Sequence, residues 1–268
     1  MLGVRAGIVI VALVVIIAVG VRVSDRVAYP SSRRYATVAG QIAALTLTDG
    51  THITLAPRSR LDVLDGDTRN VTLVGEAYFD VQQTTGRPFV VHTGTIQTRV
   101  LGTSFDIATD AVRGAVRVAV VSGKVSSGGI HPAILTAGTV AHVTDSTAVD
   151  VAPAGTAAQY SSWTSGRLMF RNAPVEEILA TLSRWYDVDF HVSDSTLLQR
   201  HVTGIFDAKS QADALTALKG VLDAAMTYQH NGDRLVILIR PLDAQSIRVP
   251  NKKAVRDSFM HSQTEVGR

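Results

Sequence analysis

The chain has 268 residues, of which 18% are charged and 46% hydrophobic, and its formal net charge is +3. It contains no cysteine, which excludes a disulfide framework, a cysteine-ligated zinc site and a cysteine nucleophile. Lysine and arginine are scattered rather than clustered, so no nucleic-acid partner is expected. The length allows one large domain or two ordinary ones.

An apolar block opens the chain. The segment from Ala6 to Val21 has no polar side chain and is bounded by an arginine on each side. As a helix it would be about 24 Å long, which is short for a bilayer core of about 30 Å unless the flanking arginines extend toward the interfaces. A cleaved signal peptide is the alternative, but Arg26 stands where a cleavage site requires a small residue. We therefore favour an uncleaved transmembrane anchor at residues 6–23.

Short segments of alternating apolar and polar residues follow between Leu45 and Val143, with turn residues between them. Asp49 and Gly50 lie between two such segments and have the chemistry of a tight hairpin turn. No helical period occurs from Gln41 to Val151. This tract predicts an all-β sandwich, barrel or wound sheet.

The stretch from Val71 to Val81 predicts a strand, a bend at Gly75 and a second strand, because alternation stops at the glycine and then resumes. Glu76 and Asp80 would lie on the same face of the second strand, about 13 Å apart, which is too far for a catalytic pair. We expect both carboxylates to be solvated and the glycine to be structural.

The period changes after Gly166, where strands alternate with two helical segments. Asn172 is a candidate cap for the first helix, and Ser210 with Asp213 has the spacing of a cap for the second. Asn231 and Gly232 then predict a closing hairpin. The predicted order is β-α-β-β-α-β-β. Two apolar helix faces are expected: Val175, Ile178, Leu179, Leu182 and Trp185 in the first, and Ala214, Leu215, Leu218, Val221 and Leu222 in the second.

The run from Val71 to Val81, followed by Arg87 to Thr93 and Arg99 to Asp106, resembles the central motif of the FecR family. These proteins are membrane-anchored regulators of extracytoplasmic-function sigma factors, best known from iron uptake. The β-α-β-β-α-β-β part resembles the secretin and TonB short N-terminal (STN) domain that many FecR-like proteins carry. The motif residues, expected to be structural, are Gly75, Glu76, Ala77, Tyr78, Phe79, Arg87, Pro88, Phe89, Leu101, Gly102, Thr103 and Phe105.

The resemblance implies a single-pass inner-membrane protein whose C-terminal body lies in the periplasm. The excess of arginines after the anchor points the other way by the positive-inside rule, but one short tail gives that rule little to count. The implied partners are the signalling domain of a TonB-dependent outer-membrane receptor and a sigma factor. FecR-type regulators bind the sigma factor through a cytoplasmic segment of several dozen residues, whereas Met1 to Arg5 alone precede the anchor here. Either the N-terminus is shortened, or the chain does not bind the sigma factor directly.

A receptor domain could add a strand to an open sheet edge of the C-terminal part. Two segments are candidates, His201 to Phe206 and Arg234 to Ile239, unless both are fully paired within the domain. The candidate partner-binding residues are Val202, Gly204, Phe206, Leu235 and Ile237.

An alternative function is an envelope-anchored module that binds glycan or protein and has no role in transcription. Tyr78, Trp163 and Trp185 could serve it, although the helical register of Trp185 favours the core. No nucleophile–base motif, phosphate-binding loop or local metal-ligand spacing occurs, so no catalytic residue, cofactor or metal is expected.

The sequence thus predicts a mainly β protein with an additional α+β domain. Its expected parts, in chain order, are a tail (1–5), a transmembrane anchor (6–23), a linker (24–35), an all-β FecR-like domain (36–151), a linker (152–165), an STN-like domain (166–241) and a flexible tail (242–268).

Overall fold

The computed structural model describes residues 32–110, 115–144, 149–152, 157–232 and 234–242. These residues form two compact units, and the division falls between Ala157 and Ala158, except that Ala39–Gln41 belong to the second unit. None of the helices in these ranges has the length and hydropathy needed to cross a membrane. The predicted anchor at 6–23 lies outside the described residues, as do the N-terminal tail and all but Leu242 of the C-terminal tail.

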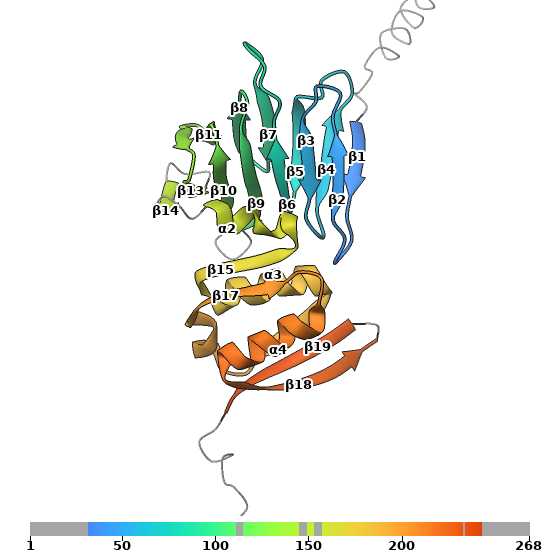
Figure 1. Ribbon diagram of the computed structural model, residues 1–268, viewed down its shortest axis with the longest axis vertical. Helices are drawn as coiled ribbons and strands as arrows, with labels where there is room; N and C mark the ends of the chain where they lie inside the picture. Colours follow the sequence, from blue (N-terminus) through green and yellow to red (C-terminus); the bar gives the residue numbers. More distant parts are fainter. Residues whose placement is uncertain (1–31, 111–114, 145–148, 153–156, 233, 243–268) are drawn as a thin grey trace, which may run out of the picture. The chain divides into compact units, whose positions relative to one another are not determined.

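The first unit, the β unit, consists of two seven-stranded sheets (Figure 1). In spatial order, one sheet contains β1 (Ser32–Ala36), β4 (Arg60–Leu64), β5 (Asn70–Val74), β7 (Phe89–Thr93), β8 (Ile96–Val100), β11 (Lys124–Gly128) and β12 (Ala133–Thr136). The other contains β14 (Val149–Ala152), β13 (Val140–Val143), β10 (Ala115–Ser122), β9 (Ser104–Asp110), β6 (Glu76–Asp80), β3 (His52–Leu55) and β2 (Ala43–Thr46). The expectation of a mainly β protein is confirmed.

Most neighbouring strands are antiparallel, and the chain repeatedly passes from one sheet to the other. The exception is β5, which runs parallel to β7 because β6 lies between them in sequence and belongs to the opposite sheet. Alternate side chains of both sheets are buried in one apolar core, which includes Val71, Leu73 and Phe79. Burial of this shared face is what selects the strand register.

Gly75 is the point at which the chain leaves one sheet and enters the other. It separates β5 from β6 and has a φ of +98°, a conformation that side chains with a Cβ rarely adopt. A Cβ at this position would lie 2.5 Å from Ser59 Oγ and 2.8 Å from Ser59 Cα. The predicted bend is therefore present, and the tight approach of Ser59 adds a second reason for glycine.

Two predicted linkers contain regular structure. Within 24–35, the chain forms β1, which pairs with β4 at the edge of its sheet. No alternating pattern marks this edge strand in the sequence, because four of its five residues are exposed and only Tyr35 packs against the core. Its Arg33 and Arg34 pair with Asp65 and Asp62. Within 152–165, α2 (Ala157–Ser161) and a short 3₁₀ helix, η1 (Ser162–Ser165), bury Trp163.

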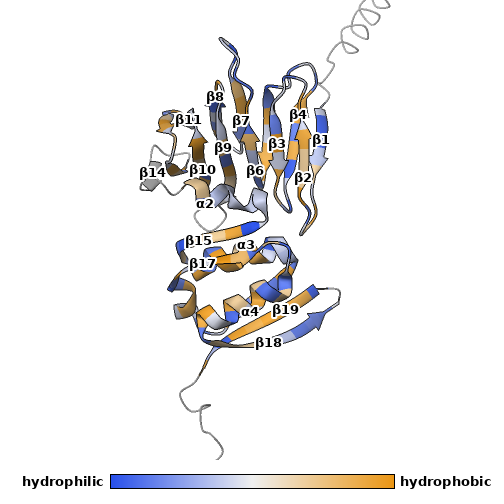
Figure 2. Ribbon diagram, viewed as in Figure 1, coloured by the Kyte–Doolittle hydropathy of each residue, from blue (hydrophilic) through white to orange (hydrophobic). Residues whose placement is uncertain are grey.

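The second unit, the C-terminal unit, has the predicted element order. It comprises β15 (Arg167–Pro174), α3 (Val175–Tyr186), β16 (Val188–Val192), the 3₁₀ helix η2 (Ser195–Gln199), β17 (His201–Asp207), α4 (Gln211–Leu222), β18 (Ala224–Asn231) and β19 (Arg234–Pro241). Two small sheets result, β15-β17 and β16-β19-β18, and in Figure 1 α3 and α4 lie between them. Figure 2 shows a hydrophobic central β19 beside a largely hydrophilic edge strand β18, as their positions require.

The helix caps and apolar helix faces agree with the predictions in part. All five residues of the predicted α3 face are buried, and Ser210 Oγ caps α4 by accepting a hydrogen bond from the Asp213 backbone N–H at 3.2 Å. Asn172 does not cap α3. It lies inside β15 with a φ of +49°, at a register shift in the pairing with β17, and its N–H donates to Thr203 Oγ1. Val221, expected in the α4 face, is exposed.

Each unit has apolar side chains buried among its own elements, and the large β core consists of β-unit residues alone. We therefore expect deletion of residues 166–240 to leave the β unit with a cooperative unfolding transition in urea, monitored by far-UV circular dichroism. Gradual loss of signal with no transition would contradict independent folding of the two units.

Candidate functional site

The family-motif residues meet at two places in the β unit. Phe79, Phe89 and Phe105 come from three strands and pack together in the core, where Phe79 stacks on Phe105 at 5.2 Å and lies 5.8 Å from Phe89. Ala77 is buried with them. Leu101 and Gly102 at the β8–β9 corner, Pro88 in the β6–β7 loop and the buried Thr103 line a pocket. The motif residues therefore contribute both to the apolar core and to a pocket at the surface.

Glu76 does not face solvent, contrary to the expectation from alternation. Its side chain is 4% exposed and lies 2.7 Å from Arg117 Nη2, which is also 3.4 Å from Asp106. The neighbouring strands β9 and β10 supply these partners, and sequence spacing alone could not bring residues so distant together. Asp80 is exposed as expected and accepts a hydrogen bond from Ser104 Oγ at 2.7 Å. The two carboxylates therefore have separate structural roles.

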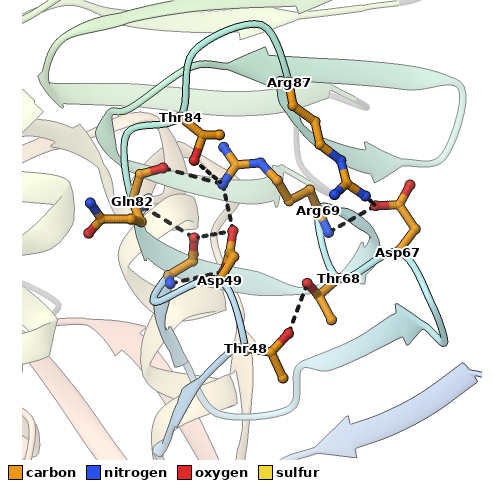
Figure 3. Close-up of polar contacts among 9 residues, drawn as sticks. Thr48, Asp49, Asp67, Thr68, Arg69, Gln82, Thr84 and Arg87 are labelled. Carbon is orange, nitrogen blue, oxygen red and sulfur yellow. Dashed lines mark hydrogen bonds and ion pairs between the residues drawn. The ribbon is translucent and has the colours of Figure 1, made fainter.

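Arg69 joins three loops at one end of the β unit (Figure 3). Its side chain is 4% exposed, and Nη1 donates to Asp49 at 2.6 Å and to the Gln82 carbonyl and Thr84 Oγ1 at 3.3 Å. The cation also lies over the Phe89 ring, 5.6 Å from its centroid. Because Asp49 is in the β2–β3 turn and Thr84 in the β6–β7 loop, this one side chain fixes both to its own segment.

A second, exposed ion pair lies beside it. Arg87 Nη2 is 2.9 Å from Asp67 Oδ1, and the same carboxylate oxygen accepts the Arg69 N–H at 3.3 Å. Arg87 is 60% exposed, so its pair with Asp67 contributes little stability and mainly orients the end of the β6–β7 loop.

The β6–β7 loop in turn lies against the β8–β9 corner. The Thr84 N–H donates to the Leu101 carbonyl at 3.0 Å. A Cβ on Gly102 would lie 2.6 Å from Gln83 Cβ, so this glycine allows the two segments to approach closely. Thr103 Oγ1 donates to the Lys124 carbonyl at 2.9 Å and ties the corner to β11.

A pocket of about 380 Å³ opens at this corner. Its lining residues are Pro88, Arg99, Val100, Leu101, Gly102, Thr103, Lys124, Val125, Ser126 and Ile134. Four of these belong to the predicted motif set. Arg99, Lys124 and Ile134 were not predicted as site residues. Arg99 begins a motif segment, but its meeting with Lys124 and Ile134 depends on strand pairing that no local pattern reveals. Arg69 was also missed, since nothing in its neighbourhood marks an arginine as buried.

In the C-terminal unit, the partner-binding prediction needs correction. β19 is the central strand of its sheet, paired with β16 on one side and β18 on the other, so Leu235 and Ile237 cannot receive an added strand. β17 pairs with β15 alone among the described strands and keeps one open edge. Val202 and Phe206 are buried, however, and Gly204 is half-buried, so the exposed face carries other residues.

The exposed face of β17 includes Thr203 and Ile205, and Ile205 is 57% exposed. Ile205 pairs across the sheet with the half-buried Met169 of β15, giving an apolar pair on the outer face. Successive side chains of a strand point to opposite faces, which explains why Val202 and Phe206 are not available to a partner. Both lie on the face that packs inward, where Phe206 is edge-on to Phe170 at 5.5 Å.

Tyr186 fixes the end of β17 to the end of α3. Its hydroxyl donates to the Asp207 carbonyl. Burial raises the pKa of Tyr186 to about 12, with smaller contributions from the negative charges of Asp207 and Asp213. The phenol therefore remains a hydrogen-bond donor throughout the range in which proteins function.

Both tryptophans of the chain are buried. Trp163 and Trp185 are each 3% exposed and pack edge to face at 6.2 Å, so neither offers a surface for stacking on a sugar. Tyr78 is half-buried, and burial raises its pKa. Within the part of the chain that the structure describes, no three histidine or carboxylate side chains are grouped to hold a metal ion.

Comparison with known proteins supports the division of the chain into a β unit and a C-terminal unit. Residues 33–126 match the sequence model described as "FecR protein", and residues 167–237 match the one described as "FecR, C-terminal". None of the curated proteins compared matches the chain.

Two crystal structures of candidate anti-sigma factors from Parabacteroides distasonis have a similar fold. One is 24% identical, covers 76% of this chain and 98% of its own, and has a TM-score of 0.66. The other is 23% identical, covers 80% of this chain and 100% of its own, and has a TM-score of 0.67. The two sequence matches together span more than half of the residues, and this chain belongs to the FecR family.

Proposed function

We propose that this chain is the periplasmic signal-transducing arm of a FecR-type sigma-factor regulator, anchored in the inner membrane by residues 6–23. The observation that carries the proposal is the presence of both FecR matches in one chain, each corresponding to one structural unit. The candidate anti-sigma factors that share the fold support the same role.

The signal is received by the C-terminal unit from the periplasmic signalling domain of a TonB-dependent outer-membrane receptor. The β17 edge supports this assignment, because an unpaired strand edge offers main-chain donors and acceptors to an added strand. Ile205 next to Met169 supplies apolar contact at the same place. Iron uptake is the process we propose for the receptor.

The location is tested by reporter fusions made after residue 35. Alkaline phosphatase fused there should be active and green fluorescent protein dark, because the first folds outside the cytoplasm and the second does not fluoresce when exported unfolded. The reverse pattern would place the body in the cytoplasm and exclude the proposed function.

Receptor binding is tested with Ile205→Glu. We expect this change to weaken binding of a receptor signalling domain, encoded beside the regulator, by about tenfold or more, because an unpaired carboxylate would be buried at the contact. Isothermal titration calorimetry gives the dissociation constant. Val221→Glu is the matched control, since Val221 is also an exposed aliphatic residue but lies on α4. Equal losses for both variants would argue against β17 as the contact.

A further inference from the structure

The pocket of the β unit lies on the outer face of its sheet. Arg99 is paired with Ser126, and Ser126 in turn with Ile134, so these three side chains form a row across β8, β11 and β12. Lys124 precedes Ser126 by two residues on β11 and points to the same side, as does Leu101 relative to Arg99. The outer face thus combines two aliphatic side chains with two cations around one concavity.

Both aliphatic side chains are exposed. Leu101 is 55% and Ile134 67% exposed, and Pro88 closes the pocket from the β6–β7 loop. β12, which carries Ile134, is the last strand of its sheet, so the pocket lies at the edge of that sheet. Apolar side chains that gather around a concavity, instead of lying singly on the surface, are typical of a binding site.

The two cations of the pocket, Arg99 and Lys124, differ from most arginines of the β unit. Six arginines of the β unit lie within ion-pair distance of a carboxylate: Arg33, Arg34, Arg60, Arg69, Arg87 and Arg117. Among the described residues, no ion pair forms at Arg99 or Lys124, and Arg99 Nη2 donates instead to the neutral Gln97 amide oxygen at 2.7 Å. None of the pocket's lining residues is acidic. The local field therefore favours a negatively charged ligand.

The walls are held in place before any ligand binds. Arg69 holds the β6–β7 loop through its hydrogen bond to Thr84 Oγ1. This loop contacts the β8–β9 corner through Thr84 and Gln83. Thr103 in turn bonds that corner to β11. A pocket held by such contacts loses little conformational entropy on binding, which suits a short linear ligand.

We propose that this pocket binds an acidic peptide segment of a partner protein. One aliphatic or aromatic side chain of the segment enters the pocket between Leu101 and Ile134, and flanking carboxylates pair with Arg99 and Lys124. This site belongs to the β unit and is independent of the receptor contact assigned to β17, so either can fail without the other.

The test measures fluorescence anisotropy of labelled pentapeptides with the full-length protein. The first probe has one leucine flanked on each side by two glutamates. The second replaces the four glutamates with glutamines, and the third replaces the leucine with alanine. We expect the first to bind at least about tenfold more tightly than either of the others, and to weaken as salt is raised, because both charge and apolar contact contribute.

Variants locate the binding. Arg99→Gln combined with Lys124→Gln, and separately Leu101→Ser, should each weaken the first probe about tenfold. Lys209→Gln with Lys219→Gln removes the same charge from exposed positions of the C-terminal unit and should leave binding unchanged. Val74→Ser is the control for Leu101, since Val74 is 48% exposed on another strand of the same sheet.

Three results would overturn the proposal. One is failure of the first probe to bind at about 1 mM, which corresponds to roughly 4 kcal/mol of affinity. Another is equal binding of the glutamate and glutamine probes. The last is displacement of the bound first probe by hexanoate at equal concentration, which would identify a small amphiphilic carboxylate, and not a peptide, as the occupant.

Discussion

Replacing Gly75 with valine should destabilise the β unit by about 3 kcal/mol or more. A non-glycine residue in such a conformation costs about 1–3 kcal/mol, and forcing extra atoms into a packed site adds a similar amount. The added Cβ would lie 2.5 Å from Ser59 Oγ, and Ser59 cannot yield freely because its backbone is also within 2.8 Å. Displacing Ser59 would in addition break the hydrogen bond that its Oγ accepts from the Glu76 N–H at 2.9 Å.

Urea unfolding followed by circular dichroism gives the free energy of unfolding. Gly66→Val is the matched control, because Gly66 has a similar φ of +81° but a Cβ there would meet no atom within 4 Å. The control should show the conformational cost alone. If both variants lost the same stability, contact with Ser59 would not contribute, and Gly75 would be required for its backbone conformation only.

Asp49→Ala is the second change with a large expected effect. It leaves the buried Arg69 guanidinium without its carboxylate, and breaking a buried ion pair in this way costs about 3–5 kcal/mol. Asp49 also accepts hydrogen bonds at 3.0 Å from the N–H and the Oγ1 of Thr51, so the β2–β3 turn should loosen. Urea unfolding measures the loss. Asp65→Ala removes an exposed partner of Arg33 and should cost less than about 1 kcal/mol.

A double-mutant cycle separates the charge from the packing. Arg69→Met combined with Asp49→Ala should recover most of the stability that Asp49→Ala loses, since an apolar side chain of similar length can fill the site and still contact Phe89. The Arg69 Nε and Nη2 atoms are buried and have no acceptor among the described residues, which lowers the net value of the arginine. A double variant no more stable than Asp49→Ala would show that hydrogen bonds from Arg69 dominate.

Replacing Asp49 should also affect peptide binding in the pocket of the β unit. Arg69 holds the β6–β7 loop, and that loop supplies Pro88 to the pocket wall. Loss of Asp49 should therefore weaken peptide binding at the β unit without altering receptor binding at β17. The two surfaces would give one chain separate contacts for two proteins.

Local sequence pattern predicted much of the secondary structure. The hairpin at Asp49 and Gly50, the bend at Gly75 and the order of the C-terminal elements all appear in the structure. Each depends on residues adjacent in sequence: a turn that needs positive φ, an interrupted alternation, or an apolar helix face. Segments without such a pattern were missed, as β1 shows, because a short, mostly exposed edge strand with a single core-facing residue carries no alternation to recognise.

The sequence by itself determined the family motif, the strand-rich first unit and the β-α-β-β-α-β-β second unit, because backbone conformation and burial periodicity are local properties. Only the tertiary structure decided which residues meet. It buried Glu76 against Arg117, placed Arg69 among three loops, and made β19 a central strand. Strand pairing joins residues distant in the chain, and burial of a charge depends on partners that no local window contains.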